Sequence, residues 1–376
     1  APVSGGARSS EGRLMNSSEK KKRGRWIRLA SILLAVLLSL AIVAGILVDR
    51  LVVRLDHLAM FLAAPDIPER RAGELRVHFV DVGQGDCTII EFPDGKTMIV
   101  DAGDTGMSSR RAVISYAHAL DIDTFDILLL THPDSDHAGG MADVLACYGA
   151  EQIWMPYCLN THVNEPYAAF VEAAAESGAS MLISQMYRSV LSDDADHFYY
   201  GMILAPLSPE IEDSAYTEPN AAPAGEEEFN DASAVLYIEY AGRRLLLTGD
   251  ASSKVEDKLV EDYLVTEGEI FAVEAEAEWG RQLLEPRLEG LDFLKAGHHG
   301  SSGSTGRDLA ELCCPKAFFV SAGADNPYAH PSMASAERVL AASPSAQIWR
   351  TDEVGSILLT VRADGSWTAA AVNDLA

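Results

Sequence analysis

Cysteine is scarce in this chain of 376 residues, and its arrangement excludes two common uses of the residue. The five cysteines form no Cys-x-x-Cys pair and show no zinc-finger spacing. Cys313 and Cys314 are adjacent, and a disulfide between neighbours would be strained. We therefore expect buried thiols. A bridge between Cys147 and Cys158 stays open if the domain lies outside the cytoplasm.

Basic residues are also few. The chain has 29 Lys and Arg against 56 Asp and Glu, which gives a formal net charge of -27. Eight of the bases but only two of the acids lie in residues 1–28, so the remainder is more acidic than the whole. An acidic body repels polyanions at long range. Any nucleic-acid substrate must therefore be held by metal ions or by a local basic patch.

A long apolar run near the N-terminus predicts a membrane anchor. Residues 29–48 contain no charged side chain, and at about 1.5 Å per residue such a helix crosses a hydrocarbon core. The preceding residues 1–25 are polar and become basic from Lys20 onward, which predicts a disordered basic N-terminus. We therefore expect a transmembrane anchor over residues 26–50.

The basic cluster also predicts the orientation of the anchor. Positively charged flanks stay in the cytoplasm, so we expect a single-pass protein of the cell membrane with a cytoplasmic N-terminus and an extracellular body. A cleaved signal peptide is the alternative. Its apolar region would span about 7–15 residues before an Ala-x-Ala-like site, and the sequence before Asp49 offers no convincing site. Beside a span, the basic cluster favours contact with anionic lipid over nucleic acid.

After a connector over residues 51–74, the body of residues 75–376 mixes strand-like and helix-like segments. Apolar alternation and turn residues predict strands near residues 75–80, 87–92, 96–100, 126–130, 234–240, 244–247, 292–295 and 317–321. An exposed acidic loop is expected over residues 208–228, and a mostly helical acidic segment over residues 252–290. Two strand-rich halves with helices between them are typical of an α/β sandwich with αββα layers.

The richest segment for function is Thr131-His-Pro-Asp-Ser-Asp-His-Ala-Gly-Gly140, which follows an apolar strand. His132, Asp134, Asp136 and His137 fall within six residues. Such crowding of carboxylates and imidazoles would be repulsive unless cations lay between them. The segment therefore predicts half of a two-metal hydrolytic site.

Other strands end in the same manner, with a polar residue or cluster directly after the apolar run. Ligand-binding and catalytic residues gather at strand ends in layered α/β folds. The five strand-end features, in chain order, are Asp101, the loop from His132 to His137, Asp250, the pair His298 and His299, and His330. We expect them to meet.

Together these segments resemble the metallo-β-lactamase-fold hydrolases, and within them the C-terminal domain of ComEC/Rec2-type competence proteins. The matching segments are Asp81-Val-Gly-Gln-Gly-Asp86, Val100-Asp-Ala-Gly103, Thr131 to Gly140, Asn230-Asp-Ala-Ser233, Leu247-Thr-Gly-Asp250, Gly297-His-His-Gly-Ser301 and Tyr328-Ala-His-Pro331. The resemblance implies an αββα metallo-β-lactamase-like sandwich over residues 75–376, preceded by one N-terminal transmembrane helix. Since the sequence shows one apolar span, the chain resembles the hydrolase domain of these proteins attached to a single membrane anchor.

The resemblance also implies two divalent metal ions, zinc or manganese. The family motif is His-x-His-x-Asp-His, and Asp134 stands here in place of the second His. The implied ligands are His132 and Asp134 for the first ion, Asp136 and His137 for the second, Asp250 bridging both, and His298 or His299 completing the second site. A carboxylate at position 134 shifts the preference from zinc toward Mn²⁺ or Mg²⁺. The usual third His is not evident, although Asn230 or Asp231 stands nearby in order.

Two such ions would hold a hydroxide and stabilise an in-line displacement at phosphorus. Asp134 or Asp136 could orient or deprotonate the water, and His330, or the second of the 298/299 pair, could protonate the leaving group. Asp101 is expected to support the metal loop. Gln84 and Asp86 either take part in the site or brace a tight glycine turn.

The function expected is that of a membrane-anchored metal-dependent hydrolase, a phosphodiesterase or nuclease related to the competence family, with DNA as a candidate substrate. One alternative is an esterase for envelope phosphodiesters of the teichoic-acid phosphorylcholine type. Another is a non-catalytic scaffold that keeps the fold as a binding module. β-Lactam hydrolysis is not expected, given Asp134 and the missing His, and the sequence identifies no protein partner.

Overall fold

A computed structural model describes residues 25–45, 64–156, 164–206 and 226–374. The chain divides into two compact units, residues Ala1–Ala59 and Met60–Ala376. In the first, a helix spans Arg25–Gly45 and is long and apolar enough to cross a membrane. The predicted disorder of the N-terminus and the bridge to Cys158 concern residues outside those described. Among the cysteines, Cys87 and Cys313 are buried as expected, whereas Cys314 is exposed.

The first sheet of the second unit contains eight strands among the described residues, in the order β17-β16-β1-β2-β3-β4-β5-β6. Its strands are β1 (Leu75–Phe79), β2 (Thr88–Glu91), β3 (Thr97–Val100), β4 (Phe125–Leu129), β5 (Ala150–Met155), β6 (Ser180–Ile183), β16 (Ile357–Val361) and β17 (Trp367–Ala371). Strands β3 to β6 run parallel, so their carboxyl ends lie along one edge. Chain segments far apart in sequence thus share one sheet, since β1 pairs with both β2 and β16.

The second sheet contains seven strands within the same described ranges, in the order β15-β14-β13-β10-β9-β8-β7. They are β7 (Ser189–Leu191), β8 (Tyr199–Ala205), β9 (Val235–Tyr240), β10 (Arg243–Leu247), β13 (Phe293–Lys295), β14 (Ala317–Val320) and β15 (Gln347–Arg350). Strands β10, β13, β14 and β15 are parallel. Their carboxyl ends deliver Asp250, the histidine pair and the segment after Val320, as expected from the sequence.

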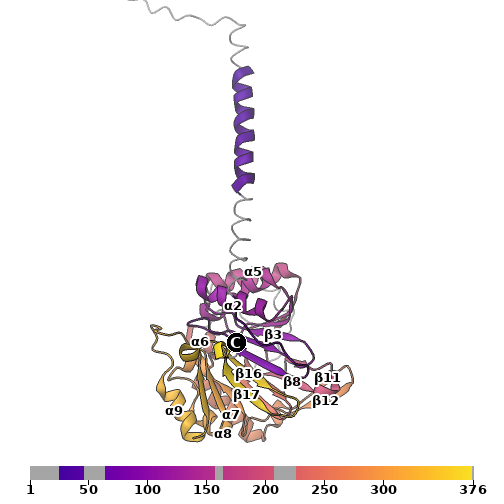
Figure 1. Cartoon of the computed structure of the whole chain (residues 1–376), viewed down its shortest axis with the longest axis vertical. Helices are drawn as coiled ribbons and strands as arrows, with labels where there is room; N and C mark the ends of the chain where they lie inside the picture. The colour runs from indigo at the N-terminus through magenta and orange to yellow at the C-terminus, as the bar shows by residue number, and fades with distance from the viewer. Residues whose placement is uncertain (1–24, 46–63, 157–163, 207–225, 375–376) are drawn as a thin grey trace, which may run out of the picture. The chain divides into compact units, whose positions relative to one another are not determined.

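Helices cover the outer faces of both sheets. One group consists of α2 (Met107–Ala119), α3 (Ser135–Ala138), α4 (Met141–Cys147) and α5 (Glu165–Ser177), and the other of α7 (Ser253–Thr266), α8 (Arg307–Cys313) and α9 (Met333–Ala342). Figure 1 shows α2 and α5 on one side of the body and α7, α8 and α9 on the opposite side, with the strands between. This arrangement confirms the predicted αββα sandwich.

Three apolar layers hold the sandwich together: one between the sheets and one under each group of helices. Between the sheets, the ring of Phe79 on β1 stacks on that of Phe319 on β14 at a centroid distance of 4.4 Å. Burying a side chain of this size contributes about 1.5–3 kcal/mol. The alternation of β1 places Leu75, Val77 and Phe79 in this layer.

Two sequence predictions about the middle of the chain need correction. The segment 252–290, expected to be mostly helical, forms α7 and then a separate antiparallel hairpin of β11 (Val273–Ala277) and β12 (Gly280–Leu284). The expected loop over residues 208–228 ends in a helix, α6 (Glu226–Asp231). The rest of that loop lies outside the described residues.

Candidate metal centre

The metal loop is built on one turn of helix placed directly after β4. Asp134 lies at the N-terminal end of α3 in an extended conformation, and its carbonyl oxygen accepts hydrogen bonds from the backbone N–H groups of His137 and Ala138, at 3.1 and 2.8 Å. A Cβ atom at Gly139 would overlap the backbone of Asp104. Glycine is therefore required for this turn to sit against the neighbouring strand end, with the His137 side chain directed inward.

Asp101 fixes the orientation of His137 from behind. It adopts a left-handed backbone conformation with φ of 59°, and its carboxylate accepts hydrogen bonds from Thr131 N (2.8 Å) and Thr131 Oγ1 (2.7 Å). His137 Nδ1 lies 2.7 Å from Asp101 Oδ2 and donates to it, because the carboxylate only accepts. His137 Nε2 therefore presents a lone pair, 3.3 Å from Asp250 Oδ1.

The tautomer of His132 follows from the same network. Thr131 has one hydroxyl proton, which it donates to Asp101, so it accepts at 3.0 Å from His132 Nδ1. This leaves a lone pair on His132 Nε2, which lies 3.5 Å from Asp134 Oδ2. The rings of His132 and His137 are 4.1 Å apart between centroids.

His299 reaches the same place from the other sheet. As in His137, its Nδ1 is held by a hydrogen bond and its Nε2 faces the carboxylates. It lies on the turn Gly297–Gly300 after β13 with φ of 51°, and its Nδ1 donates to the carbonyl oxygen of Ser321 at 3.1 Å. Its Nε2 lies 3.1 Å from Asp136 Oδ2 and 3.4 Å from Asp250 Oδ2. The adjacent His298, with a side chain 35% exposed, places its Nε2 at 3.7 Å from Asp250 Oδ2.

Four buried groups converge most closely. One ligand atom from each of Asp86, His137, Asp250 and His299 lies within 4.8 Å of the others. We call these four residues the central cluster. Among the described residues, His132 Nε2, His137 Nε2 and Asp250 Oδ1 have no hydrogen-bond partner. Buried polar atoms are almost always satisfied, so three such atoms at one place fit a site that binds a cation.

The carboxylates of the central cluster also favour a positive charge beside them. Burial lowers the pKa of His299, but the carboxylates of Asp250 and Asp86 outweigh it and raise this pKa to about 10. Burial likewise opposes the charge on His137, whose pKa is nevertheless raised well above its usual value by Asp250 and Asp101. Without a metal ion the carboxylates favour the protonated imidazoles, whereas a bound divalent cation would supply the positive charge and leave the imidazoles neutral, with the Nε2 lone pairs free to bind it. Imidazole and carboxylate donors fit Zn²⁺ or Mn²⁺.

The structure brings the sequence-predicted site residues to one place, although not equally closely. His137, Asp250 and His299 belong to the central cluster, and Asp136 contacts it through His299. His132 and Asp134 face each other at its side. The ring of His330 lies 5.4 Å from that of His298 and 6.5 Å from that of His299.

Sequence reasoning left Asp86 open and missed Lys295. Asp86 Oδ1 lies 3.6 Å from His299 Nδ1, and its other oxygen forms a buried ion pair with Lys295 Nζ. Neither residue stands directly after an apolar strand, because Asp86 follows the turn after β1 and Lys295 is the last residue of β13. The sequence signal for Lys295 was a lysine within an apolar strand, because a buried lysine needs a charged partner. Asn230, weighed as a further ligand, has a buried Oδ1 with no hydrogen-bond partner in the described part of the chain.

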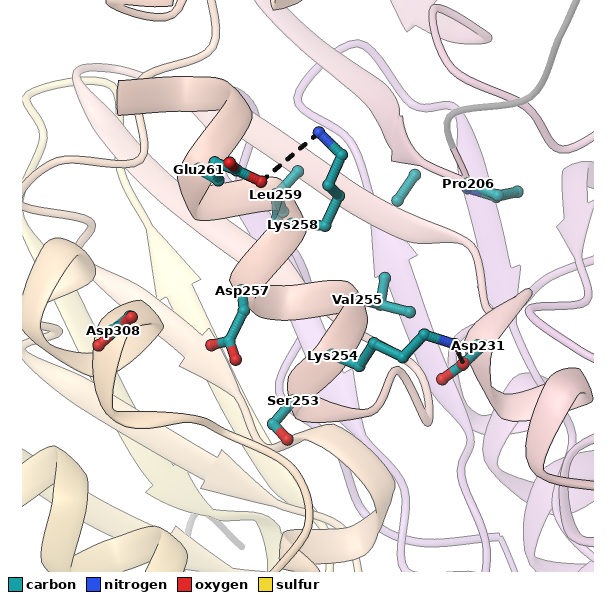
Figure 2. Close-up of a pocket in the computed structure, with 11 residues that line it drawn as sticks. Pro206, Asp231, Ser253, Lys254, Val255, Asp257, Lys258, Leu259, Glu261 and Asp308 are labelled. Atoms are coloured by element: carbon teal, nitrogen blue, oxygen red, sulfur yellow. Dashed lines mark hydrogen bonds and ion pairs between the residues drawn. The ribbon is translucent and has the colours of Figure 1, made fainter. Parts of the chain in front are cut away.

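A hollow of about 830 Å³ lies on α7 and is a separate feature. Figure 2 shows its lining, which includes Lys254, paired with Asp231, and Lys258, paired with Glu261. None of the cluster residues lines it. Because both lysines are neutralised by neighbouring carboxylates, the hollow offers no evident anion site. The hollow is therefore not part of the candidate metal centre.

Comparisons with known proteins identify the family of the chain. The chain is 28% identical over 302 residues to ComE operon protein 3 of Bacillus subtilis, covering 76% of this chain and 33% of that protein. It is 26% identical over 267 residues to Recombination protein 2 of Haemophilus influenzae, covering 70% and 26%. The chain thus spans a third or less of these curated relatives. Both similarities confirm the predicted resemblance to the ComEC/Rec2 proteins.

Solved structures with a similar architecture include CmlA, a diiron β-hydroxylase from Streptomyces venezuelae. It is 13% identical, with a TM-score of 0.45 over 78% of this chain and 54% of that one. Igni18, a metallo hydrolase from Ignicoccus hospitalis, is 12% identical, with a TM-score of 0.40 over 79% and 98%.

The family model described as the metallo-beta-lactamase superfamily matches residues 80–317, which contain every residue of the central cluster. Since this match covers more than half of the chain, the protein belongs to the metallo-β-lactamase superfamily.

Proposed function

We propose that this protein is a membrane-anchored, metal-dependent phosphodiesterase that acts on nucleic acid, with DNA as the first candidate. The observation that carries the proposal is the central cluster, in which Asp86, His137, Asp250 and His299 converge within 4.8 Å. The relatives support the nucleic-acid part, since one is named Recombination protein 2, and the other, ComE operon protein 3, is of the same ComEC/Rec2 type.

Two divalent ions, zinc or manganese, are proposed as cofactors. His137, Asp250 and His299 would hold one of them with Asp136, and His132 and Asp134 would contribute to the other, with Asp250 between. His298 or Asp86 could complete either set. When bound, such ions activate water and polarise phosphoryl oxygens.

The side chains around the cluster have distinct roles in this proposal. Asp136 has a partly exposed carboxylate, which would accept a hydrogen bond from the attacking water and orient it. Asp134 is exposed to a similar extent and could act in the same way. His330 lies beyond His298 and would donate a proton to the leaving oxygen. Asp101 and Ser321 O keep His137 and His299 in the tautomer that presents Nε2.

The helix Arg25–Gly45 would anchor the protein in the cell membrane. The basic residues before it favour a cytoplasmic N-terminus and an extracellular body. A reporter fused after Ala376 tests this orientation, because an enzyme that requires export should be active there. If instead only a reporter that works in the cytoplasm were active after Ala376, the proposed orientation would be wrong.

The activity is tested on full-length protein in detergent. We expect about two equivalents of bound Mn²⁺ or Zn²⁺ and cleavage of bis-p-nitrophenyl phosphate and single-stranded DNA. His137→Ala should abolish cleavage, whereas the control His118→Ala, on α2, should not. A folded wild-type protein that binds no metal and cleaves nothing would favour a non-catalytic scaffold. Cleavage of phosphorylcholine esters but not of DNA would favour an envelope substrate.

A further inference from the structure

An exposed aromatic ring stands next to the metal centre. Tyr328 is 66% exposed, and its ring lies almost parallel to that of His330, at 6.0 Å between centroids and an angle of 15°. His330 in turn lies 5.4 Å from His298 and 6.5 Å from His299. The ring of Tyr328 therefore continues a row of rings that begins at the central cluster.

The turn that carries Tyr328 is held by one side chain. Asn326 Oδ1 accepts hydrogen bonds from the backbone N–H groups of Tyr328 and His330, both at 3.1 Å. Its Nδ2 donates to the carbonyl oxygens of Gly323, at 2.8 Å, and of His330. A single amide thus ties both ends of the turn. A ring on such a fixed turn loses little conformational entropy when a ligand stacks on it.

The same turn is clamped between two motifs of the site. On one side, Gly323 packs against the backbone of Gln84, and its N–H donates to Gln84 Oε1 at 3.3 Å. On the other side, Ser332 N donates to Gly300 O at 2.8 Å, and Pro331 lies against Gly300. The position of Tyr328 is therefore coupled to the loops that carry Asp86 and His299.

Apart from bound metal ions, the acidic chain offers little positive charge to attract a polyanion at this place. The chain has a formal net charge of -27. Lys295 is buried against Asp86, and Arg350, which precedes the Thr351 that supports this turn, is paired with Asp352 and Glu353. Base stacking on an aromatic ring contributes about 1–3 kcal/mol per base without requiring positive charge.

The form of the ring selects among ligands. In a duplex the bases already stack on one another, so only a splayed base of a single strand can use an exposed tyrosine. A quaternary ammonium group is instead recognised by several electron-rich rings together. Among the described residues, the only ring in contact with that of Tyr328 is the imidazole of His330, so the aromatic cage that such a cation requires is not formed.

We propose that Tyr328 is a stacking platform for a base of a single-stranded nucleic acid, beside the phosphodiester at the metal centre. The position of the phosphodiester rests on the function proposed above, whereas the stacking does not. Tyr328 thereby makes the site specific for unpaired, base-bearing strands.

Binding is measured by fluorescence anisotropy on full-length protein in detergent with EDTA, so that no strand is cleaved. The probes are a labelled single-stranded oligonucleotide and an abasic strand of equal length. Wild type should prefer the base-bearing strand by about tenfold, and Tyr328→Ala should lose this preference. Tyr328→Phe should keep it. Tyr187→Ala, which removes a partly exposed tyrosine that contacts Ile270, is the matched control and should also keep it.

The outcomes separate the stacking from the hydrolysis. If wild type shows no preference, or Tyr328→Ala retains it, stacking is overturned even when the enzyme cleaves DNA with metal restored. If the preference depends on Tyr328 but no cleavage occurs with Mn²⁺ or Zn²⁺, stacking stands and the proposed activity fails. Weaker binding of free phosphorylcholine by Tyr328→Ala, with unchanged binding of the strand, would overturn the proposal in favour of a choline ligand.

Discussion

The ammonium group of Lys295 forms an ion pair with the carboxylate of Asp86 in the interior, where both side chains are 3% exposed. Asp86 also faces His299, so the pair connects the end of β13 to the β1 turn. The lysine holds the pKa of Asp86 below its usual value, although burial opposes the charge. Two elements from different sheets are thus joined by one buried charge pair at the metal centre.

Removing the cation of this pair should be costly. Lys295→Met leaves a buried carboxylate without its partner, and we expect a loss of about 3–5 kcal/mol in the free energy of unfolding. Urea unfolding of the full-length protein with EDTA measures it. The double variant Lys295→Met/Asp86→Leu should recover most of the loss. Lys258→Met, which breaks a surface pair, should change stability by less than about 1 kcal/mol. A single Lys295→Met variant as stable as wild type would contradict the buried pair.

Asp101 should control metal affinity without touching the metal. Asp101→Asn tolerates the left-handed conformation, but its amide can present an N–H group to His137 Nδ1 and favour the other tautomer. We expect Mn²⁺ or Zn²⁺ to bind about 10–100-fold more weakly, as measured by calorimetry. Nitrogen NMR of the metal-free protein, at a pH above the raised pKa of His137, should show the tautomer change in the neutral ring. Asp126→Asn, at an aspartate on β4 that contacts Thr97, is the control and should leave the affinity unchanged.

Much of this site was predictable because strand ends in parallel sheets converge. His137 and His299 each follow an apolar strand, and both lie where their sequence position suggested. Asp86 was ambiguous because its contacts with His299 and Lys295 join segments about 200 residues apart. The hairpin from β11 to β12 was mistaken for a helix, since Glu and Ala favour helices. The half-buried and exposed alternation of Val273–Ala277 shows that the period of two was the better guide.

Glu256 gives the fold a pH dependence outside the metal centre. It is buried on α7, and burial raises its pKa to about 7, although the N–H groups of Thr305 (2.8 Å) and Gly306 (2.7 Å) favour the charged form. In the folded state Glu256 keeps its proton at pH values where the unfolded chain would lose it. The contribution of the protonated Glu256 to stability is therefore fully present below about pH 4.5 and is lost as pH rises through 7.

Glu256→Gln stays neutral throughout and tests this contribution. Its stability relative to wild type should rise by up to about 3 kcal/mol between pH 5 and pH 8. Urea unfolding at several pH values measures the difference. The stability of the control Glu261→Gln, at an exposed residue of the same helix, should change with pH in the same way as that of wild type. If the stability of Glu256→Gln changed with pH in the same way as that of wild type, Glu256 would have its ordinary pKa.

Two glycines of one turn provide a matched pair. Gly85 has φ of 132°, and a Cβ there would overlap the carbonyl oxygen of Asp136, to which Asp86 N donates at 3.1 Å. Gly83 has φ of 77° and open space around it. Gly83→Ala should therefore cost only the backbone strain, about 1–2 kcal/mol. Gly85→Ala should cost more and also displace the loop of Asp136 and His137, so that metal affinity falls. Urea unfolding and metal titration of both variants separate strain from displacement, since equal losses in the two would mean that the turn does not position the loop.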